Sequence, residues 1–206
     1  MTKTVFEPSI RSPPVYGELE PRPGSAHLIV ADGEGADAVV DLFAKAGADA
    51  EEMLARAHII YAPGPNGTDL AEKLEALGAE QFFRSPTFAS AVPRIRKVLA
   101  DAHMGLQVYL TGTEGLMGQV QAEAMAAGIP HSAVQTEHRG STVRRVQCVH
   151  CKGITENVRT DPFVCSHCGL NLFVRDHYSR RIAAFQGVNI DAEDPGLVPP
   201  AVERFK

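Results

Sequence analysis

Residues 106–137, LQVYLTGTEGLMGQVQAEAMAAGIPHSAVQTE, give the clearest indication of the fold. The segment opens with an apolar, β-prone run that ends at Thr111 and turns through the glycine-containing residues 112–115. It continues as a helix-prone stretch to about Ala127, and a Gly-Ile-Pro sequence then breaks the helix before a last β-prone run at 133–137. This order predicts one strand–helix–strand unit.

The same alternation of a short apolar run and an amphipathic stretch occurs three more times toward the N-terminus. The apolar runs are 27–31, 58–62 and 80–84. We expect Thr68 to cap the second helix, 69–77, because a threonine hydroxyl can accept from the first free backbone N–H groups of a helix. Strands that alternate with helices predict a parallel sheet covered on both faces. Residues 26–139 therefore predict a doubly wound α/β domain with a five-stranded, mostly parallel sheet.

The segments outside this domain differ from it in composition. Residues 1–25 and 188–206 are rich in proline and lack apolar periodicity, so we expect two irregular arms. Residues 140–187 hold several short β-prone runs interleaved with the cysteines, and we expect a small β module, a zinc ribbon, followed by a helix.

The four cysteines of the chain indicate a metal site. Cys148 and Cys151 form one Cys-x-x-Cys pair, Cys165 and Cys168 form a second pair, and thirteen residues separate the two pairs. Two such pairs can supply four thiolates in a tetrahedron around Zn²⁺. A site of four cysteines leaves no open coordination position for water, so we expect the metal to stabilise the fold rather than to catalyse hydrolysis.

Two alternatives to this zinc site follow from the same residues. Rubredoxin-like iron sites also use two Cys-x-x-Cys pairs. The Pro-Tyr-Gly sequence that surrounds the cysteines in that class is missing here. His150 and His167 each lie between two cysteines, so that either could replace one as a ligand. We expect both histidines to face solvent.

Composition narrows the function classes. The chain of 206 residues is 44% hydrophobic with a formal net charge of −5, which removes the general electrostatic reason to bind nucleic acid. The sequence holds no apolar stretch of about 20 residues and no secretory signal at its start, so we expect a cytoplasmic protein without a membrane segment. In that compartment cysteines are expected to bind metal rather than to form disulfides.

The glycine turns are weak candidates for nucleotide binding. Gly33 and Gly35 follow the first strand, and Gly112 with Thr111 ends the fourth, which is where a dinucleotide would meet a helix N-terminus. Carboxylates at 32, 34 and 37 would repel a pyrophosphate there. The alternative interpretation is that these glycines let helices pack closely on strands. We find no nucleophile elbow, Walker loop or His-Glu-x-x-His sequence.

Two resemblances add to this interpretation. Residues 108–118, with 128–130 and 136–138, resemble the last strand, helix and strand of the NAD-binding module of ferredoxin-reductase-type flavoproteins. In that family a flavin-binding barrel accompanies the module, and the 25 residues before the first strand are too few for one. The resemblance therefore implies a reductase module that has lost its cofactor.

The run CSHCGLNLFVRDHYSRRIAAFQGV, residues 165–188, followed by residues 191–196, resembles the DmmA-type subunits of bacterial dimethylamine monooxygenases. This resemblance implies an oxygenase of several subunits that uses NADPH and O₂ to convert dimethylamine to methylamine and formaldehyde. Haem, flavin and iron–sulfur centres are then expected on the partner subunits, and an accessory role for this chain.

Two other functions stay open from the sequence. One is a reductase component that still binds NAD(P)H through Gly33, Gly35, Thr111 and Gly112, and the other, less favoured, is a nucleic-acid-binding ribbon protein. The basic and aromatic residues that follow the cysteines could dock an acidic partner such as a ferredoxin domain. These residues are Arg175, His177, Tyr178, Arg180, Arg181 and Phe185.

Overall fold

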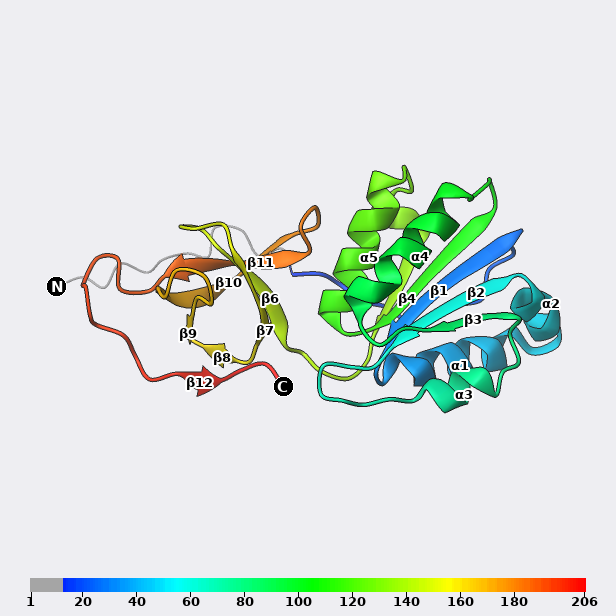
Figure 1. Ribbon diagram of the computed structural model, residues 1–206, viewed down its shortest axis with the longest axis horizontal. Helices are drawn as coiled ribbons and strands as arrows, with labels where there is room; N and C mark the ends of the chain where they lie inside the picture. Colours follow the sequence, from blue (N-terminus) through cyan, green and yellow to red (C-terminus); the bar gives the residue numbers. More distant parts are fainter. Residues whose placement is uncertain (1–12) are drawn as a thin grey trace. The chain divides into compact units, whose positions relative to one another are not determined.

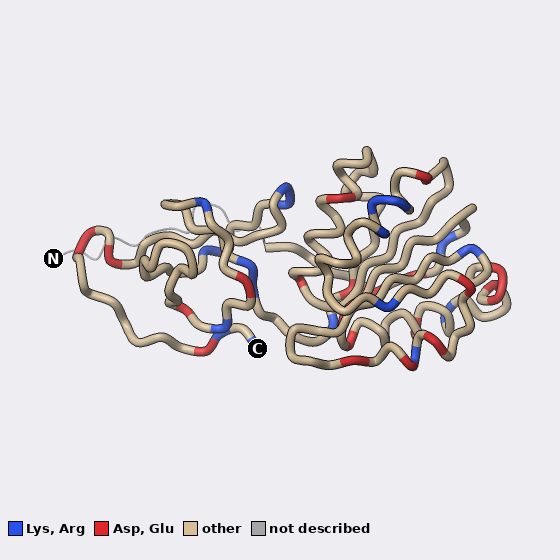
Figure 2. The backbone as a smooth tube through the Cα atoms, viewed as in Figure 1, with Lys and Arg blue, Asp and Glu red and all other residues tan. Residues whose placement is uncertain are grey.

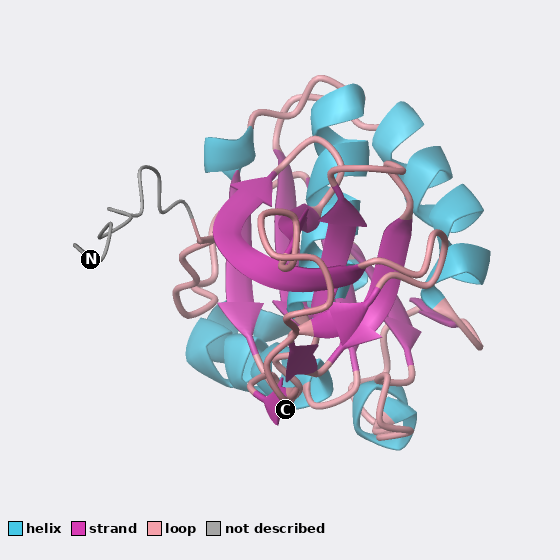
Figure 3. Cartoon of the chain, turned by 90° about the vertical axis from the view of Figure 1, so that its left-hand side faces the viewer, coloured by secondary structure: helices cyan, strands magenta, loops and turns pink. Residues whose placement is uncertain are grey.

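The computed structural model describes residues 13–206, which divide into two compact units. The first, the α/β unit, consists of residues 16–143 together with Lys206, and the second, the β unit, of residues 144–205 with the described residues 13–15. All the helices of the described residues, which are cyan in Figure 3, belong to the α/β unit.

The α/β unit is built on a five-stranded sheet in which every pair of neighbouring strands is parallel. Its strands are β1 (Ala26–Asp32), β2 (Ala57–Ala62), β3 (Gln81–Arg84), β4 (Leu106–Gly112) and β5 (Val134–His138). They lie in the order β3-β2-β1-β4-β5, so the chain reverses its direction of winding between β1 and β4. The predicted doubly wound, five-stranded α/β fold is confirmed.

Helices cover both faces of this sheet (Figure 1). On one face lie α1 (Gly35–Ala46), α2 (Ala50–Ala55) and α3 (Ala71–Glu75), and on the other α4 (Phe88–Ala100) and α5 (Glu114–Ala126). Short 3₁₀ turns, η1 (Gly47–Asp49) and η2 (His131–Ala133), complete the connections. Side chains alternate across the sheet, so Ile29 packs in the core under α1 while Leu28 packs in the core under α4 and α5.

The prediction that Thr68 caps the second helix is wrong. The helix after β2 is shorter than 69–77, and its N-cap residue is Leu70 rather than Thr68. The Thr68 hydroxyl instead donates a hydrogen bond to Oε1 of Glu34, at 3.0 Å, because residues 64–68 form a turn that crosses the start of α1. A contact of this kind joins residues far apart in sequence and gives no local signal.

The expected N-terminal arm is packed where the structure describes it. Leu19 is 1% exposed and belongs to the core under α1. The backbone N–H of Leu19 donates to Oε2 of Glu137 at 2.7 Å, and that of Gly17 donates to the carbonyl of Thr136 at 2.9 Å. Proline excludes helix here but does not exclude an extended segment laid against a sheet edge. Residues 1–12 of the arm lie outside the described residues.

The β unit contains a second five-stranded sheet, in the order β7-β6-β11-β10-β9. Its strands are β6 (Arg144–Cys148), β7 (Ile154–Val158), β9 (Phe163–Val164), β10 (Asn171–Ser179) and β11 (Ala184–Asn189). A separate pair joins β8 (Thr160–Asp161) to β12 (Val202–Glu203).

The helix expected after the cysteines is wrong, because β10 and β11 form an antiparallel hairpin. Leu172 and Val174, two residues apart on one face of β10, are both buried, which is strand periodicity. The expected C-terminal arm is also partly ordered by packing. Phe205 is 7% exposed and lies against the guanidinium of Arg144, whose carbon is 4.4 Å from the ring centroid.

Acidic and basic residues are interspersed along both units (Figure 2). Within the described residues, none of the helices has the length and apolar character needed to cross a bilayer.

Candidate metal centre

The four cysteines come from two turns of the β unit. Cys148 ends β6 and Cys151 lies in the turn that leads to β7, while Cys165 follows β9 and Cys168 lies in the turn that leads to β10. The structure brings all four together, and their sulfur atoms lie within 4.8 Å of one another. The predicted cysteine cluster is therefore present.

The spacing of the sulfur atoms fits a tetrahedral metal. The Sγ atoms of Cys148 and Cys168 are 3.8 Å apart, and those of Cys151 and Cys165 are 3.7 Å apart. A zinc–sulfur distance of about 2.3 Å in a tetrahedron requires an edge of about 3.8 Å between sulfurs. A disulfide would instead need a separation of about 2.05 Å. The donor set and its dimensions thus fit one Zn²⁺ held by the four thiolates.

The two cysteine turns are built in the same way. In the first, the N–H of Cys148 donates to the carbonyl of Gly153 at 2.9 Å, and the N–H of Lys152 donates back to the carbonyl of Cys148 at 3.0 Å. The second repeats both bonds, from Cys165 to Leu170 at 2.9 Å and from Gly169 to Cys165 at 3.0 Å. In each turn the fifth residue has a positive φ, 63° at Lys152 and 75° at Gly169.

The histidines inside the pairs are not in the cysteine cluster. His150 and His167 are both exposed, as expected. His167 nevertheless links the two turns, because its Nε2 lies 2.9 Å from the carbonyl oxygen of Ile154. Its ring also packs over Gly153, where any Cβ would collide with Cγ of the imidazole. No sequence motif predicts the pairing of His167 with Ile154 or Gly153.

Local hydrogen bonding favours the thiolate of Cys165. Burial acts to raise the pKa of this thiol, but hydrogen bonds from the backbone N–H groups of Cys168 and His167 and from neighbouring thiols outweigh it. The pKa falls to about 6. A thiolate is the form that binds metal, so these hydrogen bonds suit Cys165 to the role of a ligand.

The cysteine cluster is also part of the β unit's core. Cys148 and Cys165 are 0% and 2% exposed and pack with Val146, Leu172 and Phe185. Because the four sulfurs would complete a tetrahedron, no position is left for a water or a substrate. The chemistry that this arrangement supports is structural.

The glycine turns lie at the carboxyl edge of the parallel sheet, where the structure brings Gly33, Gly35, Thr111 and Gly112 together. Gly35 allows α1 to approach β4, because a Cβ there would lie 2.6 Å from the carbonyl oxygen of Thr111. Thr111 is 0% exposed and its hydroxyl has no partner among the described residues. The three glycines thus allow close packing within the α/β unit.

A carboxylate of the chain itself lies at this edge. Oδ1 of Asp32 accepts from the N–H of Thr113, and Oδ2 accepts from its hydroxyl, both at 2.6 Å. A Cβ at Gly112 would collide with Oδ1, so the glycine makes room for the side chain. Burial raises the pKa of Asp32 to about 6, against the opposing effect of the Thr113 hydrogen bonds. Asp32 thus occupies the N–H and the hydroxyl of Thr113, the N-cap residue of α5, and places a carboxylate close to the start of that helix.

Comparison with known proteins places the chain in a family. The family description "Dimethylamine monooxygenase subunit DmmA-like, N-terminal domain" matches residues 8–134, which is more than half of the chain. The corresponding C-terminal domain matches residues 145–188 and so includes all four cysteines. This chain belongs to the DmmA-like family.

A curated relative agrees with the DmmA-like assignment. The heme-dependent oxidative N-demethylase delta subunit of Ectopseudomonas mendocina (strain ymp) is 33% identical over 110 residues, which are 53% of this chain. The chain covers 63% of the length of that relative.

Solved structures give only distant likenesses. A flavohemoglobin from Malassezia yamatoensis is 19% identical, with a TM-score of 0.40 over 58% of this chain and 33% of that one. Full-length CYP116B46 from Tepidiphilus thermophilus is 14% identical, with a TM-score of 0.39 over 76% of this chain and 19% of that one.

Proposed function

We propose that this DmmA-like chain is a non-catalytic, zinc-binding subunit of a cytoplasmic, multisubunit N-demethylating oxygenase. The reaction of the complex would convert dimethylamine, with O₂ and NADPH, to methylamine and formaldehyde. The observation that carries the proposal is the DmmA-like match in both units, joined to a cysteine cluster with no room for a substrate. The haem, flavin and iron–sulfur centres would belong to the partner subunits.

The zinc would hold the β unit together in this proposal. Residues 140–187 would form the ribbon, with Cys148, Cys151, Cys165 and Cys168 as its ligands. A metal bound by both cysteine turns would contribute directly to the free energy of folding of the β unit. Iron in the same site is the competing assignment, and metal analysis of the purified chain separates the two.

The β10–β11 hairpin is our candidate for contact with an acidic partner subunit. Arg180 and Arg181 are exposed at its turn, and no ion pair holds either of them within the described residues. Arg175 lies on β10 beside the irregular register of the hairpin. Charges placed at a protruding turn mainly raise the rate of association with an oppositely charged surface.

Co-purification tests the proposal. The chain, tagged alone, is co-expressed with the candidate haem and flavin/iron–sulfur subunits, and the purified material is examined for absorption and metal content. We expect a coloured complex with one zinc per copy of this chain. Arg180→Gln with Arg181→Gln should lower the yield of partner subunits, whereas the matched control, Arg96→Gln with Lys97→Gln on α4, should not. A chain that purifies alone would contradict the proposal.

A second candidate function is an NAD(P)H-binding reductase component. The strand order and the glycine turn after β1 favour it, because dinucleotides bind at this edge of such sheets. Asp32 and the neighbouring Glu34 oppose it by their charge. Titration of the isolated chain with NADPH separates the two functions: saturable binding by the isolated chain would favour the reductase component, and no binding would favour the accessory subunit.

A further inference from the structure

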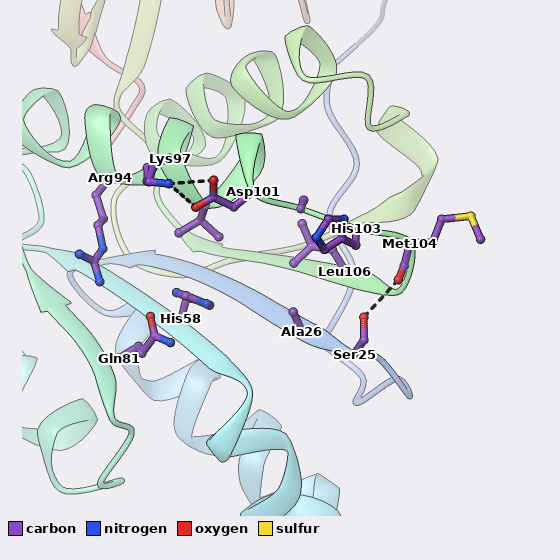
Figure 4. A pocket seen from close by; sticks show the side chains of 12 residues that line it. Ser25, Ala26, His58, Gln81, Arg94, Lys97, Asp101, His103, Met104 and Leu106 are labelled. Atoms are coloured by element: carbon purple, nitrogen blue, oxygen red, sulfur yellow. Dashed lines mark hydrogen bonds and ion pairs between the residues drawn. The ribbon is translucent and has the colours of Figure 1, made fainter.

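A cavity of about 610 Å³ opens at the amino edge of the parallel sheet, opposite to the glycine turns. The starts of β1, β2, β3 and β4 form its floor, and the second half of α4 with the turn after it forms its roof (Figure 4). All of its lining residues belong to the α/β unit. Neither the family match nor the relative's name assigns a role to this place.

One side of the cavity is polar and carries a cation without a carboxylate partner. His58 and Gln81 are register partners on β2 and β3, and Figure 4 shows both side chains directed toward α4. Arg94 descends from α4 toward them. Its guanidinium carbon lies 5.6 Å from the ring centroid of Phe83, and within the described residues it makes no ion pair.

The neighbouring lysine is already neutralised. Nζ of Lys97 lies 2.8 Å and 2.6 Å from the two carboxylate oxygens of Asp101. Arg94 is therefore the cationic side chain of the lining that can still form an ion pair with a ligand. His58 adds an unused hydrogen-bonding atom, because its Nδ1 is buried and has no partner among the described residues. A buried polar atom without a partner is costly unless a ligand or water completes it.

The other side of the cavity carries aliphatic side chains beside two polar residues, Ser25 and His103 (Figure 4). Val98 and Leu106 line it together with the small side chains of Ala26 and Ala102. Met104 stands at the rim and is 98% exposed. A flexible, exposed methionine is a common feature of surfaces that adapt to an apolar group. The cavity thus combines the Arg94 guanidinium with aliphatic side chains, and with the side chains of His58 and Gln81, which can donate or accept hydrogen bonds.

We propose that this cavity binds a small organic carboxylate. The carboxylate would be held by Arg94, with hydrogen bonds from His58 and Gln81, and a short aliphatic body would lie against Val98, Leu106 and Met104. A planar guanidinium suits a carboxylate, since it can donate two parallel hydrogen bonds.

The test uses the full zinc-loaded chain and three probes: hexanoate, hexanol and inorganic phosphate. Each is titrated while backbone and methyl NMR signals of the cavity residues are followed. We expect saturable shifts with hexanoate only, confined to the cavity. Arg94→Gln should weaken hexanoate binding by about tenfold or more, which is the effect of losing a charge-assisted pair.

Arg96→Gln is the matched control, because Arg96 lies on the same helix, is exposed and bonds Glu123 outside the cavity. It should bind hexanoate as the parent chain does. Equal binding by Arg94→Gln and the parent would overturn the proposal, as would equal shifts with hexanol, which lacks the charge. A response to phosphate without one to hexanoate would overturn the assignment to an organic carboxylate.

Discussion

Replacing Asp32 by asparagine should change the way in which the stability of the α/β unit depends on pH. Burial raises the pKa of this carboxyl from 3.8 to about 6 in the folded chain. Between about pH 4 and about pH 6 the folded state therefore keeps a proton that the unfolded state has already released. The free energy of unfolding falls as pH rises through this range. At about 1.4 kcal/mol per pKa unit, the loss amounts to about 3 kcal/mol above about pH 7.

Asparagine cannot ionise, yet it can keep both contacts with Thr113. Its Oδ1 can accept from the backbone N–H, and its Nδ2 can donate to the hydroxyl. The difference in unfolding free energy, Asp32→Asn minus parent, should therefore rise by about 2.5 kcal/mol between about pH 4 and about pH 7.

Urea denaturation followed by the helical far-UV circular dichroism signal measures this difference. All helices of the described residues lie in the α/β unit, so the signal reports that unit. Any release of metal from the β unit at low pH is common to both proteins and cancels in the comparison. Asp49→Asn, at an exposed position, controls for the substitution itself. A difference that stays constant from pH 4 to pH 7 would refute the reasoning.

Three further predictions concern the β unit. Gly169→Ala should lower the free energy of unfolding by about 1 kcal/mol. The cost comes from the backbone alone, because φ is 75° there and the added methyl meets nothing within 4 Å. Urea titration with a zinc-release dye measures this change. Cys165→Ser should abolish stable zinc retention, measured as metal per chain after dialysis against a chelator. Arg144→Ala should destabilise the unit by about 2 kcal/mol, since its guanidinium lies 3.9 Å from the Phe185 ring and 4.4 Å from that of Phe205; the same titration measures it.

Each of these predictions has a contradicting result. Unchanged stability of Gly169→Ala would mean that the turn tolerates another backbone conformation. Full zinc retention by Cys165→Ser would show that three thiolates suffice or that the metal lies elsewhere. Unchanged stability of Arg144→Ala would show that the C-terminal segment contributes little to the unit.

The α/β sheet could be predicted because its signals are local. Apolar runs such as 27–31 and 58–62 lie on strands that are buried on both faces, and the helices between them keep a helical spacing of apolar residues. The cysteine cluster could be predicted for the same reason, since the Cys-x-x-Cys spacing fixes both turns.

The β10–β11 hairpin could not be predicted in the same way. The register shifts between Arg175 and Tyr178, which interrupts the alternation that marks a strand. The contact of Asp32 with Thr113 joins residues 81 positions apart, and only the parallel pairing of β1 with β4 brings them together. The cavity under α4 likewise depends on elements that meet only in the folded unit.

Reconstitution of the oxygenase tests the central claim most directly. The haem and flavin/iron–sulfur subunits are purified without this chain and assayed for conversion of dimethylamine to methylamine with NADPH and O₂, before and after the zinc-loaded chain is added. The proposed role predicts that the chain restores activity to the incomplete complex, and that its one zinc is retained unchanged through turnover. Full activity of the other subunits without this chain would contradict it.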